Sequence, residues 1–174
     1  MLNSPHNNVF LIGPMGSGKS AVGRHLARKL TLDFLDSDEE IEARTGVDIP
    51  YIFEKEGEEG FRRRESALIA ELTGLQNIVL ATGGGAAQDP QNRQQLAKHG
   101  TVIYLYTSVP EQLSRTQNSR HRPLLNNGDP ADVLEELMAR RDPQYREIAD
   151  LIVETDGCQV AAVVRQILKK INKE

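Results

Sequence analysis

The chain has 174 residues, of which 39% are hydrophobic and 26% charged, with a formal net charge of -4. This is the size and composition of one ordinary globular domain. No apolar run approaches the roughly 20 residues of a membrane span, and the acidic balance argues against general binding to nucleic acid. The lone Cys158 excludes an internal disulfide, and the start MLNSPHNNV lacks the features of a secretory signal. We therefore predict a cytoplasmic monomer without membrane or nucleic-acid partners.

The first predicted strand, residues 9–12, runs into the sequence GPMGSGKS at 13–20, after which apolar residues recur at helical spacing. The pattern G-x-x-x-x-G-K-S between a strand and a helix indicates a phosphate-binding loop, whose backbone N–H groups face the phosphates. Lys19 is predicted to contact the outer phosphates, and the Ser20 hydroxyl to bind Mg2+. The alternative is a glycine turn followed by Lys-Ser by chance.

The second strand, residues 33–38, contains two acids one residue apart, Asp36 and Asp38, and leads into a helix beginning near Glu39. Side chains two positions apart on a strand point the same way, so both acids can face one cleft. We interpret Asp36 as a partner of the hydrated magnesium and Asp38 as the group that orients an acceptor hydroxyl. The alternative is that Asp38 caps the following helix.

The sequence GFRRRE, residues 60–65, places three arginines at the predicted start of a helix. The apolar stripe of this helix is predicted to be Phe61, Leu68, Leu72 and Leu75. Cations at a helix start oppose the helix dipole, so a functional reason is open beside the simpler one of a solvated face. Helical spacing turns Arg64 toward the stripe more readily than Arg62.

The third strand, residues 77–82, is followed by three glycines at 83–85. A backbone N–H can approach a ligand closely there because no Cβ intervenes, and a tight turn is a compatible alternative. A fourth strand is predicted at 101–106. The irregular segment 116–130, rich in Asn, Gly, Pro and Arg, is predicted to be a lid or binding loop whose arginines can meet a transferred phosphoryl group.

In the helix predicted from Ala131, Arg141 continues the apolar stripe seven residues beyond Leu134, whereas Arg140 points elsewhere. A guanidinium on the inward face needs an anionic partner, because burying an unpaired charge is costly. The alternative is that Arg141 serves the C-terminus of its helix just before Pro143.

The last predicted strand, residues 151–155, precedes a terminal helix at about 160–171. Strands that alternate with helices imply an α/β fold with a mostly parallel sheet covered on both faces. Ligands of such sheets bind beyond the carboxyl ends of the strands. Because no repeat or linker divides the chain, residues 1–174 are predicted to form one domain.

The ordered set GPMGSGKS, LDSD, FRRRE, TGGGA, RPLL and RRDPQY resembles the shikimate kinase family from about Val9 to Leu168. The resemblance implies a P-loop three-layer sandwich with a five-stranded parallel sheet in the order 2-3-1-4-5. It also implies a substrate-binding region at about 36–65 and a mobile lid at about 115–128. The implied reaction transfers the ATP γ-phosphoryl group to the 3-hydroxyl of shikimate, giving shikimate 3-phosphate and ADP, in aromatic amino acid biosynthesis.

The same resemblance implies the site residues. ATP is expected to contact Gly16, Ser17, Gly18, Lys19, Ser20, Ala21, Arg115 beside the adenine, and the lid residue Arg122. Mg2+ is expected on Ser20 and, through water, on Asp36. Shikimate is expected on Asp38, Arg62, Gly84 and Arg141, with the arginines and the backbone around Gly84 holding mainly its carboxylate. The expected catalytic residues are Asp38 as candidate base, Lys19 and Arg122. The family pattern selects Arg62 rather than Arg64.

Two other functions compete with this one. A related small-metabolite kinase, such as a gluconate kinase, shares the phosphate-binding loop and the size, but LDSD, FRRRE and TGGGA favour shikimate kinase. A nucleotide-binding regulator without phosphoryl transfer is the second, and the presence of Lys19, Ser20, Asp36 and Asp38 argues against it.

Overall fold

The computed structural model describes residues 7–118 and 123–172. Its strands are β1 (Val9–Ile12), β2 (Asp33–Asp36), β3 (Ile78–Ala81), β4 (Thr101–Tyr106) and β5 (Leu151–Glu154). Its helices are α1 (Lys19–Leu30), α2 (Ser37–Thr45), α3 (Ile49–Leu72), α4 (Pro90–His99), α5 (Val109–Thr116), α6 (Pro130–Ile148) and α7 (Val160–Ile171), with short 3-10 turns η1 (Ala86–Gln88) and η2 (Pro123–Asn126).

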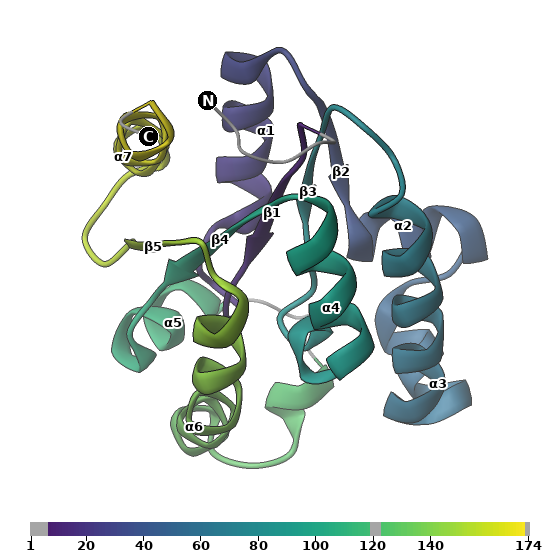
Figure 1. Ribbon diagram of the computed structural model, residues 1–174. Coiled ribbons are helices and arrows are strands. Elements are labelled where there is room, and N and C mark those ends of the chain that lie inside the picture. The colour runs from purple at the N-terminus through teal and green to yellow at the C-terminus, as the bar shows by residue number, and fades with distance from the viewer. Residues whose placement is uncertain (1–6, 119–122, 173–174) are drawn as a thin grey trace.

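The five strands form one parallel sheet in the order β2-β3-β1-β4-β5, which confirms the predicted fold class and strand order. Its central strands are fully buried, because helices cover both faces. Alternate residues of β1 belong to different cores: Phe10 and Ile12 pack with α3, α4 and α6, whereas Val9 and Leu11 pack with α1 and α7. Figure 1 shows the resulting three layers.

Three predicted elements, β1, β4 and α7, have the bounds expected, because β1 and β4 are short apolar runs and α7 has a clear apolar face at helical spacing. The helix after β2 begins at Ser37 rather than near Glu39. The prediction that GFRRRE starts a helix is only partly right. These residues lie inside α3, just after a kink at Gly57, whose φ of 70° and ψ of 178° interrupt the helix. Leu75 lies beyond α3 and is 43% exposed, so its assignment to the apolar stripe is wrong.

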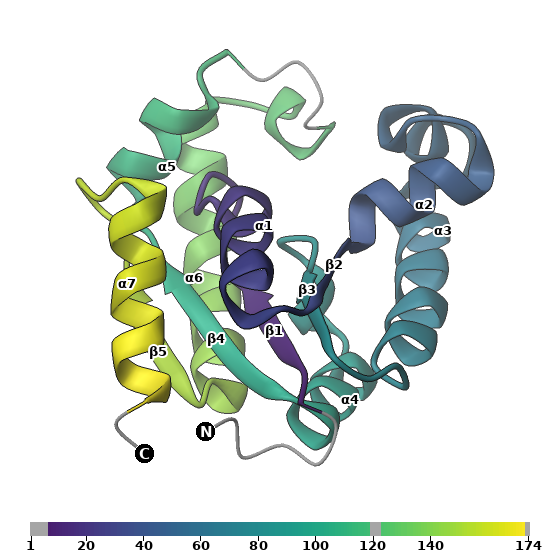
Figure 2. The same cartoon turned by 90° about the horizontal axis from the view of Figure 1, so that it is seen from above.

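The carboxyl ends of all five strands meet at one edge of the sheet, because the strands are parallel. Figure 2 shows α2 and the first part of α3 on one side of this edge, and η2 on the other. Across the described residues, no helix is both long and apolar enough to cross a bilayer.

Candidate functional site

The loop between β1 and α1 has the geometry of a phosphate cradle. Gly18, which precedes the first turn of α1, has a φ of 84°, a conformation that glycine adopts at little cost. The Lys19 ammonium folds back over the loop and donates to the carbonyls of Gly13 at 2.7 Å and Pro14 at 2.8 Å. A helix N-terminus and a cation therefore converge on one point, which suits a bound polyphosphate.

Asp36, and not Asp38, caps α2. Its Oδ1 accepts hydrogen bonds from the N–H groups of Asp38 at 2.9 Å and Glu39 at 3.1 Å, while its Oδ2 accepts from the Ser20 hydroxyl. The alternative that Asp38 is the capping residue is therefore wrong. The contact between Asp36 and Ser20 joins the end of β2 to the start of α1 and brings together a hydroxyl and a carboxylate, two oxygen donors of the kind that Mg2+ prefers.

Because Asp38 does not cap the helix, its carboxylate is free to point into a pocket. Its Oδ1 is inaccessible to solvent and has no hydrogen-bond partner among the described residues. Burial, followed by the nearby carboxylates of Glu65 and Asp36, raises the pKa of Asp38 from 3.8 to about 7. A carboxyl group with a pKa near 7 can both accept and release a proton at neutral pH.

The three arginines of α3 have different surroundings. Arg63 pairs with Glu59 and Arg64 with Glu56, both at the surface, whereas the Arg62 side chain is 23% exposed and donates to Glu65 at 2.8 Å. The preference of simple helical spacing for Arg64 is wrong, because the buried face of this helix also includes Glu65 and Ile69, which shifts its centre toward Arg62. The solvated-face explanation holds for Arg63 and Arg64 only.

Arg141 is 3% exposed and points inward from the middle of α6, while Arg140 lies at the surface with Glu136. The helix continues through Pro143 to Ile148, so the alternative that Arg141 serves a helix C-terminus is wrong. Burial lowers the pKa of Arg141, and its Nε and Nη2 have no partner among the described residues. A buried guanidinium with free donors is a strong site for an anion.

The three glycines after β3 leave room for the charged side chains of the pocket. A Cβ at Gly83 would lie 2.7 Å from Glu65 Oε2 and 2.9 Å from Asp38 Oδ1. At Gly84 it would lie 3.3 Å from Arg141 Nη1, and at Gly85 2.3 Å from Arg62 Nη2. The loop is thus both a turn and a floor on which two carboxylates and two guanidinium groups rest.

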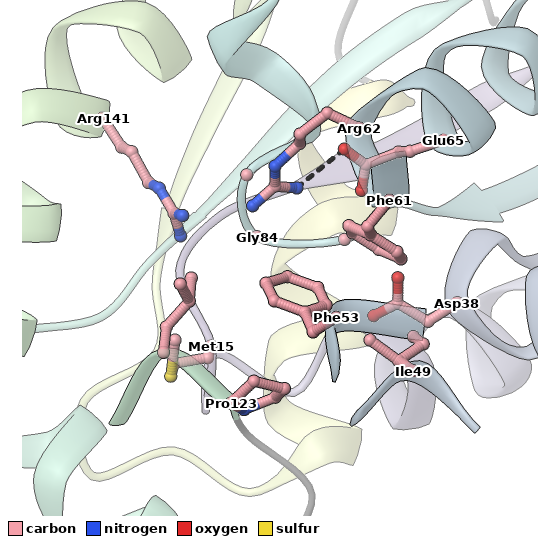
Figure 3. A pocket seen from close by; sticks show the side chains of 13 residues that line it. Met15, Asp38, Ile49, Phe53, Phe61, Arg62, Glu65, Gly84, Pro123 and Arg141 are labelled. Atoms are coloured by element: carbon pink, nitrogen blue, oxygen red, sulfur yellow. Dashed lines mark hydrogen bonds and ion pairs between the residues drawn. The ribbon is translucent and has the colours of Figure 1, made fainter. Parts of the chain in front are cut away.

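These groups enclose a pocket of about 100 Å³ between the phosphate-binding loop, α2, α3, α6 and η2. Figure 3 shows Arg141 reaching in from one side and Arg62 from the other, with Asp38 beside the aromatic ring of Phe53. The Arg62 Nε and one oxygen of Glu65 also lack a partner among the described residues. Unsatisfied charged groups on an otherwise apolar wall indicate a small ligand that carries both an anionic group and hydroxyls.

Arg115 lies at the opposite end of the phosphate-binding loop. Its guanidinium donates to the Gly16 carbonyl at 3.0 Å and to the Thr155 carbonyl at 2.8 Å, and so ties α5 to the loop after β5. Cys158 follows in this same loop, where its N–H donates to Thr155. This is the side of the phosphate cradle away from the pocket. Arg122, the predicted lid arginine, lies outside the described residues.

Sequence reasoning missed several pocket residues. Glu65 was part of the FRRRE motif but received no role, although its spacing of three from Arg62 puts both on one helix face. The apolar wall comprises Met15, Ile49, Phe53, Phe61, Pro123 and Leu124. No signal in the sequence separates these residues from ordinary core positions, because pocket walls and cores have the same composition.

Known proteins resemble this chain over nearly all of its length. A model of the shikimate kinase family matches residues 15–172. A shikimate kinase of Halorhodospira halophila is 55% identical over 165 residues, which cover 95% of this chain and 93% of that relative. A solved shikimate kinase from Acinetobacter baumannii, in complex with shikimate, is 50% identical, with a TM-score of 0.93 over 95% of this chain and 93% of that one.

The rival family is more distant. A solved gluconokinase from Sinorhizobium meliloti has a TM-score of 0.64 at 19% identity, over 95% of this chain and 91% of that one. At this identity the likeness shows a common fold alone.

Proposed function

The chain belongs to the shikimate kinase family and is an ATP-dependent kinase, and we propose that its pocket binds shikimate and presents the 3-hydroxyl to the γ-phosphate of ATP. The products are shikimate 3-phosphate and ADP. The observation that carries the proposal is the meeting, in one pocket beside the phosphate-binding loop, of two guanidinium groups with the carboxylate of Asp38. Shikimate offers a carboxylate to the guanidinium groups and vicinal hydroxyls to Asp38.

Arg62 and Arg141 hold the substrate carboxylate between them. Arg141 keeps donors free for it, and the Glu65 carboxylate orients Arg62 through their ion pair. Charge-assisted hydrogen bonds to a carboxylate are stronger than neutral ones, and opposed guanidinium groups fix the direction of the ring as well as its charge. The backbone of the glycine loop near Gly84 completes the floor below the substrate.

Asp38 accepts a hydrogen bond from the reacting hydroxyl and takes its proton as the phosphoryl group departs from ATP. Phosphoryl transfer passes through a loose transition state, so orientation of the hydroxyl accounts for most of the effect of this residue. Lys19 binds the phosphates, and Arg122 from the proposed lid at about 115–128 approaches them when the lid closes. Closure excludes water, which otherwise competes with the substrate for the phosphoryl group.

Residues 16–21 and Arg115 bind ATP in this proposal. Mg2+ would be held by the Ser20 hydroxyl and, through water, by Asp36, and the direct contact between these two groups supports such a site. When bound, the ion neutralises charge on the phosphates. The chain acts as a single domain in which α2 and α3 supply the substrate-binding region.

The direct test measures ADP release with shikimate, with gluconate and with no acceptor. We expect turnover with shikimate only, because gluconate lacks the rigid ring that spans from the arginines to Asp38. Equal rates in all three reactions would contradict the kinase assignment, and turnover with gluconate alone would transfer it to the rival metabolite.

The pKa of Asp38 gives the reaction a predictable pH dependence. Because burial and Glu65 raise this pKa to about 7, the carboxyl group is protonated below that pH and cannot accept the proton of the hydroxyl. We expect kcat/KM for shikimate to fall with decreasing pH, by about tenfold for each pH unit below about 7, as for the uptake of one proton. A flat profile through this range would show that Asp38 does not titrate there.

The substitution Gly85→Ala tests the role of the glycine floor. The added Cβ would meet Arg62 Nη2 at 2.3 Å, so the guanidinium has to move out of the pocket, and it can do so because its side chain is flexible. We expect KM for shikimate to rise by about tenfold or more, as for the loss of a charge-assisted hydrogen bond, while KM for ATP is unchanged. The control is Gly74→Ala, where the nearest atom is 3.3 Å away and remote from the pocket.

A further inference from the structure

Tyr145 of α6 is 1% exposed and lies beneath the glycine loop, one helical turn beyond Arg141. Its hydroxyl donates a hydrogen bond to the carbonyl of Gly84. Its ring packs against the ring of Tyr104, with the centroids 4.9 Å apart. Tyr145 belongs to the motif RRDPQY, but the resemblance implies no role for it, and Tyr145 does not line the substrate pocket.

The Gly84 carbonyl has a particular need for this contact. The carbonyls on either side belong to the 3-10 turn: Gly83 accepts from the N–H of Ala86, and Gly85 accepts from that of Gln88, each at 3.1 Å. The Gly84 carbonyl lies between them, and the turn offers it no donor. A partly buried carbonyl without a partner is costly, so the hydroxyl of Tyr145 decides which way this peptide group faces.

The direction of the carbonyl also sets the direction of an N–H group. A peptide unit is planar and trans, so the N–H of Gly85 points opposite to the carbonyl of Gly84. Within residues 7–118 and 123–172, the N–H groups of Gly84 and Gly85 have no protein acceptor. Both glycines line the pocket, and a Cβ added at Gly84 would lie 3.3 Å from Arg141 Nη1.

We propose that Tyr145 is a positioning residue of the acceptor site, which holds the Gly84–Gly85 peptide so that the floor of the pocket presents N–H donors to the substrate. The same residue supports Arg141, because a side-chain hydrogen bond joins the Tyr145 hydroxyl to Arg141 one helical turn away. This inference rests on the proposed function, since the substrate it serves is shikimate. It predicts an effect on the acceptor half of the site and none on the nucleotide half.

The test compares Tyr145→Phe with Tyr104→Phe. Both substitutions remove one hydroxyl from a buried tyrosine of the same pair of packed rings, but the Tyr104 hydroxyl donates to Asp142 at 2.7 Å, away from the pocket. Shikimate is titrated calorimetrically into each protein without nucleotide. We expect the dissociation constant to rise by about tenfold in Tyr145→Phe only, as for one lost positioning hydrogen bond, with KM for ATP unchanged in both variants.

A second readout does not depend on activity. In protein labelled with 15N-glycine, the amide signals of Gly84 and Gly85 should shift in Tyr145→Phe and stay in place in Tyr104→Phe. In the unsubstituted protein they should shift on addition of shikimate, a measurement that holds even if Tyr145→Phe folds poorly. Unmoved glycine signals, or equal weakening of shikimate binding in both variants, would overturn the inference. Failure of the unsubstituted protein to bind shikimate would instead contradict the proposed function.

Discussion

Replacement of Asp38 by Asn is expected to lower kcat by about a thousandfold, the usual scale for losing a group that accepts a proton and orients a nucleophile. The amide keeps the shape of the side chain, but it accepts a hydrogen bond more weakly than a carboxylate and so orients the hydroxyl poorly, and it cannot take the proton. ATP binding should persist, since Asp38 is not part of the phosphate cradle. Steady-state kinetics with shikimate, and nucleotide binding measured by calorimetry, separate the two effects.

The same variant should be more stable than the unsubstituted protein. The pKa of Asp38 is raised from 3.8 to about 7, so the native state holds a proton that the unfolded chain has already released in this range. The free energy of unfolding therefore falls as the pH rises from about 3.8 to about 7, and above pH 7 the full loss remains. We expect a higher Tm for Asp38→Asn above neutral pH. Asp33→Asn, at the exposed start of β2, is the matched control for both measurements. Normal turnover in Asp38→Asn would refute the proposed role.

Replacement of Arg141 by Lys is expected to raise KM for shikimate by about a hundredfold. Lysine keeps the charge, but its single ammonium cannot reproduce the fork of donors that faces the substrate carboxylate, and it is more strongly hydrated. Arg140→Lys is the matched control, because Arg140 is the next residue on the same helix and makes only a surface ion pair with Glu136.

The effect of Arg141→Lys should be confined to shikimate. Because Arg141 acts on the carboxylate alone, KM for ATP should be unchanged in both variants. If Arg141→Lys and Arg140→Lys have the same KM for shikimate, Arg141 does not contact the substrate. A parallel loss of ATP affinity would indicate instead that the substitution disturbs the nearby phosphate-binding loop.

The parts of the site that the sequence predicted well are those set by local chemistry. The loop GPMGSGKS can be identified because each residue type is needed at its position by the phosphate cradle, whatever surrounds it. Strand order 2-3-1-4-5 and the family came from the ordered set of motifs, and the structure and the family model confirm both. Arg141 could be selected because it interrupts an apolar stripe, which is a periodic signal.

For other features the sequence and the family resemblance gave an expectation, but residue spacing gave no physical reason for it. Asp36 and Asp38 are equivalent as sequence neighbours of a helix start, and the two roles separate only because Asp36 satisfies the first N–H groups of α2 and so leaves Asp38 free to face Glu65. Arg62 rather than Arg64 enters the pocket because the buried face of α3 includes the polar Glu65, which an apolar stripe does not count.

By itself, therefore, the sequence determined the phosphate cradle, the parallel α/β sheet and the set of charged side chains available to the acceptor. The family resemblance implied that Asp38, Arg62 and Arg141 share the acceptor site, but only the tertiary structure adds Glu65 and shows why these charges meet. Glu65, Arg62, Asp38 and Arg141 come from three different helices and converge only because three glycines leave room for them at the end of β3. Contacts between distant segments depend on how helices pack against the sheet, and neither residue spacing nor helical periodicity records that packing.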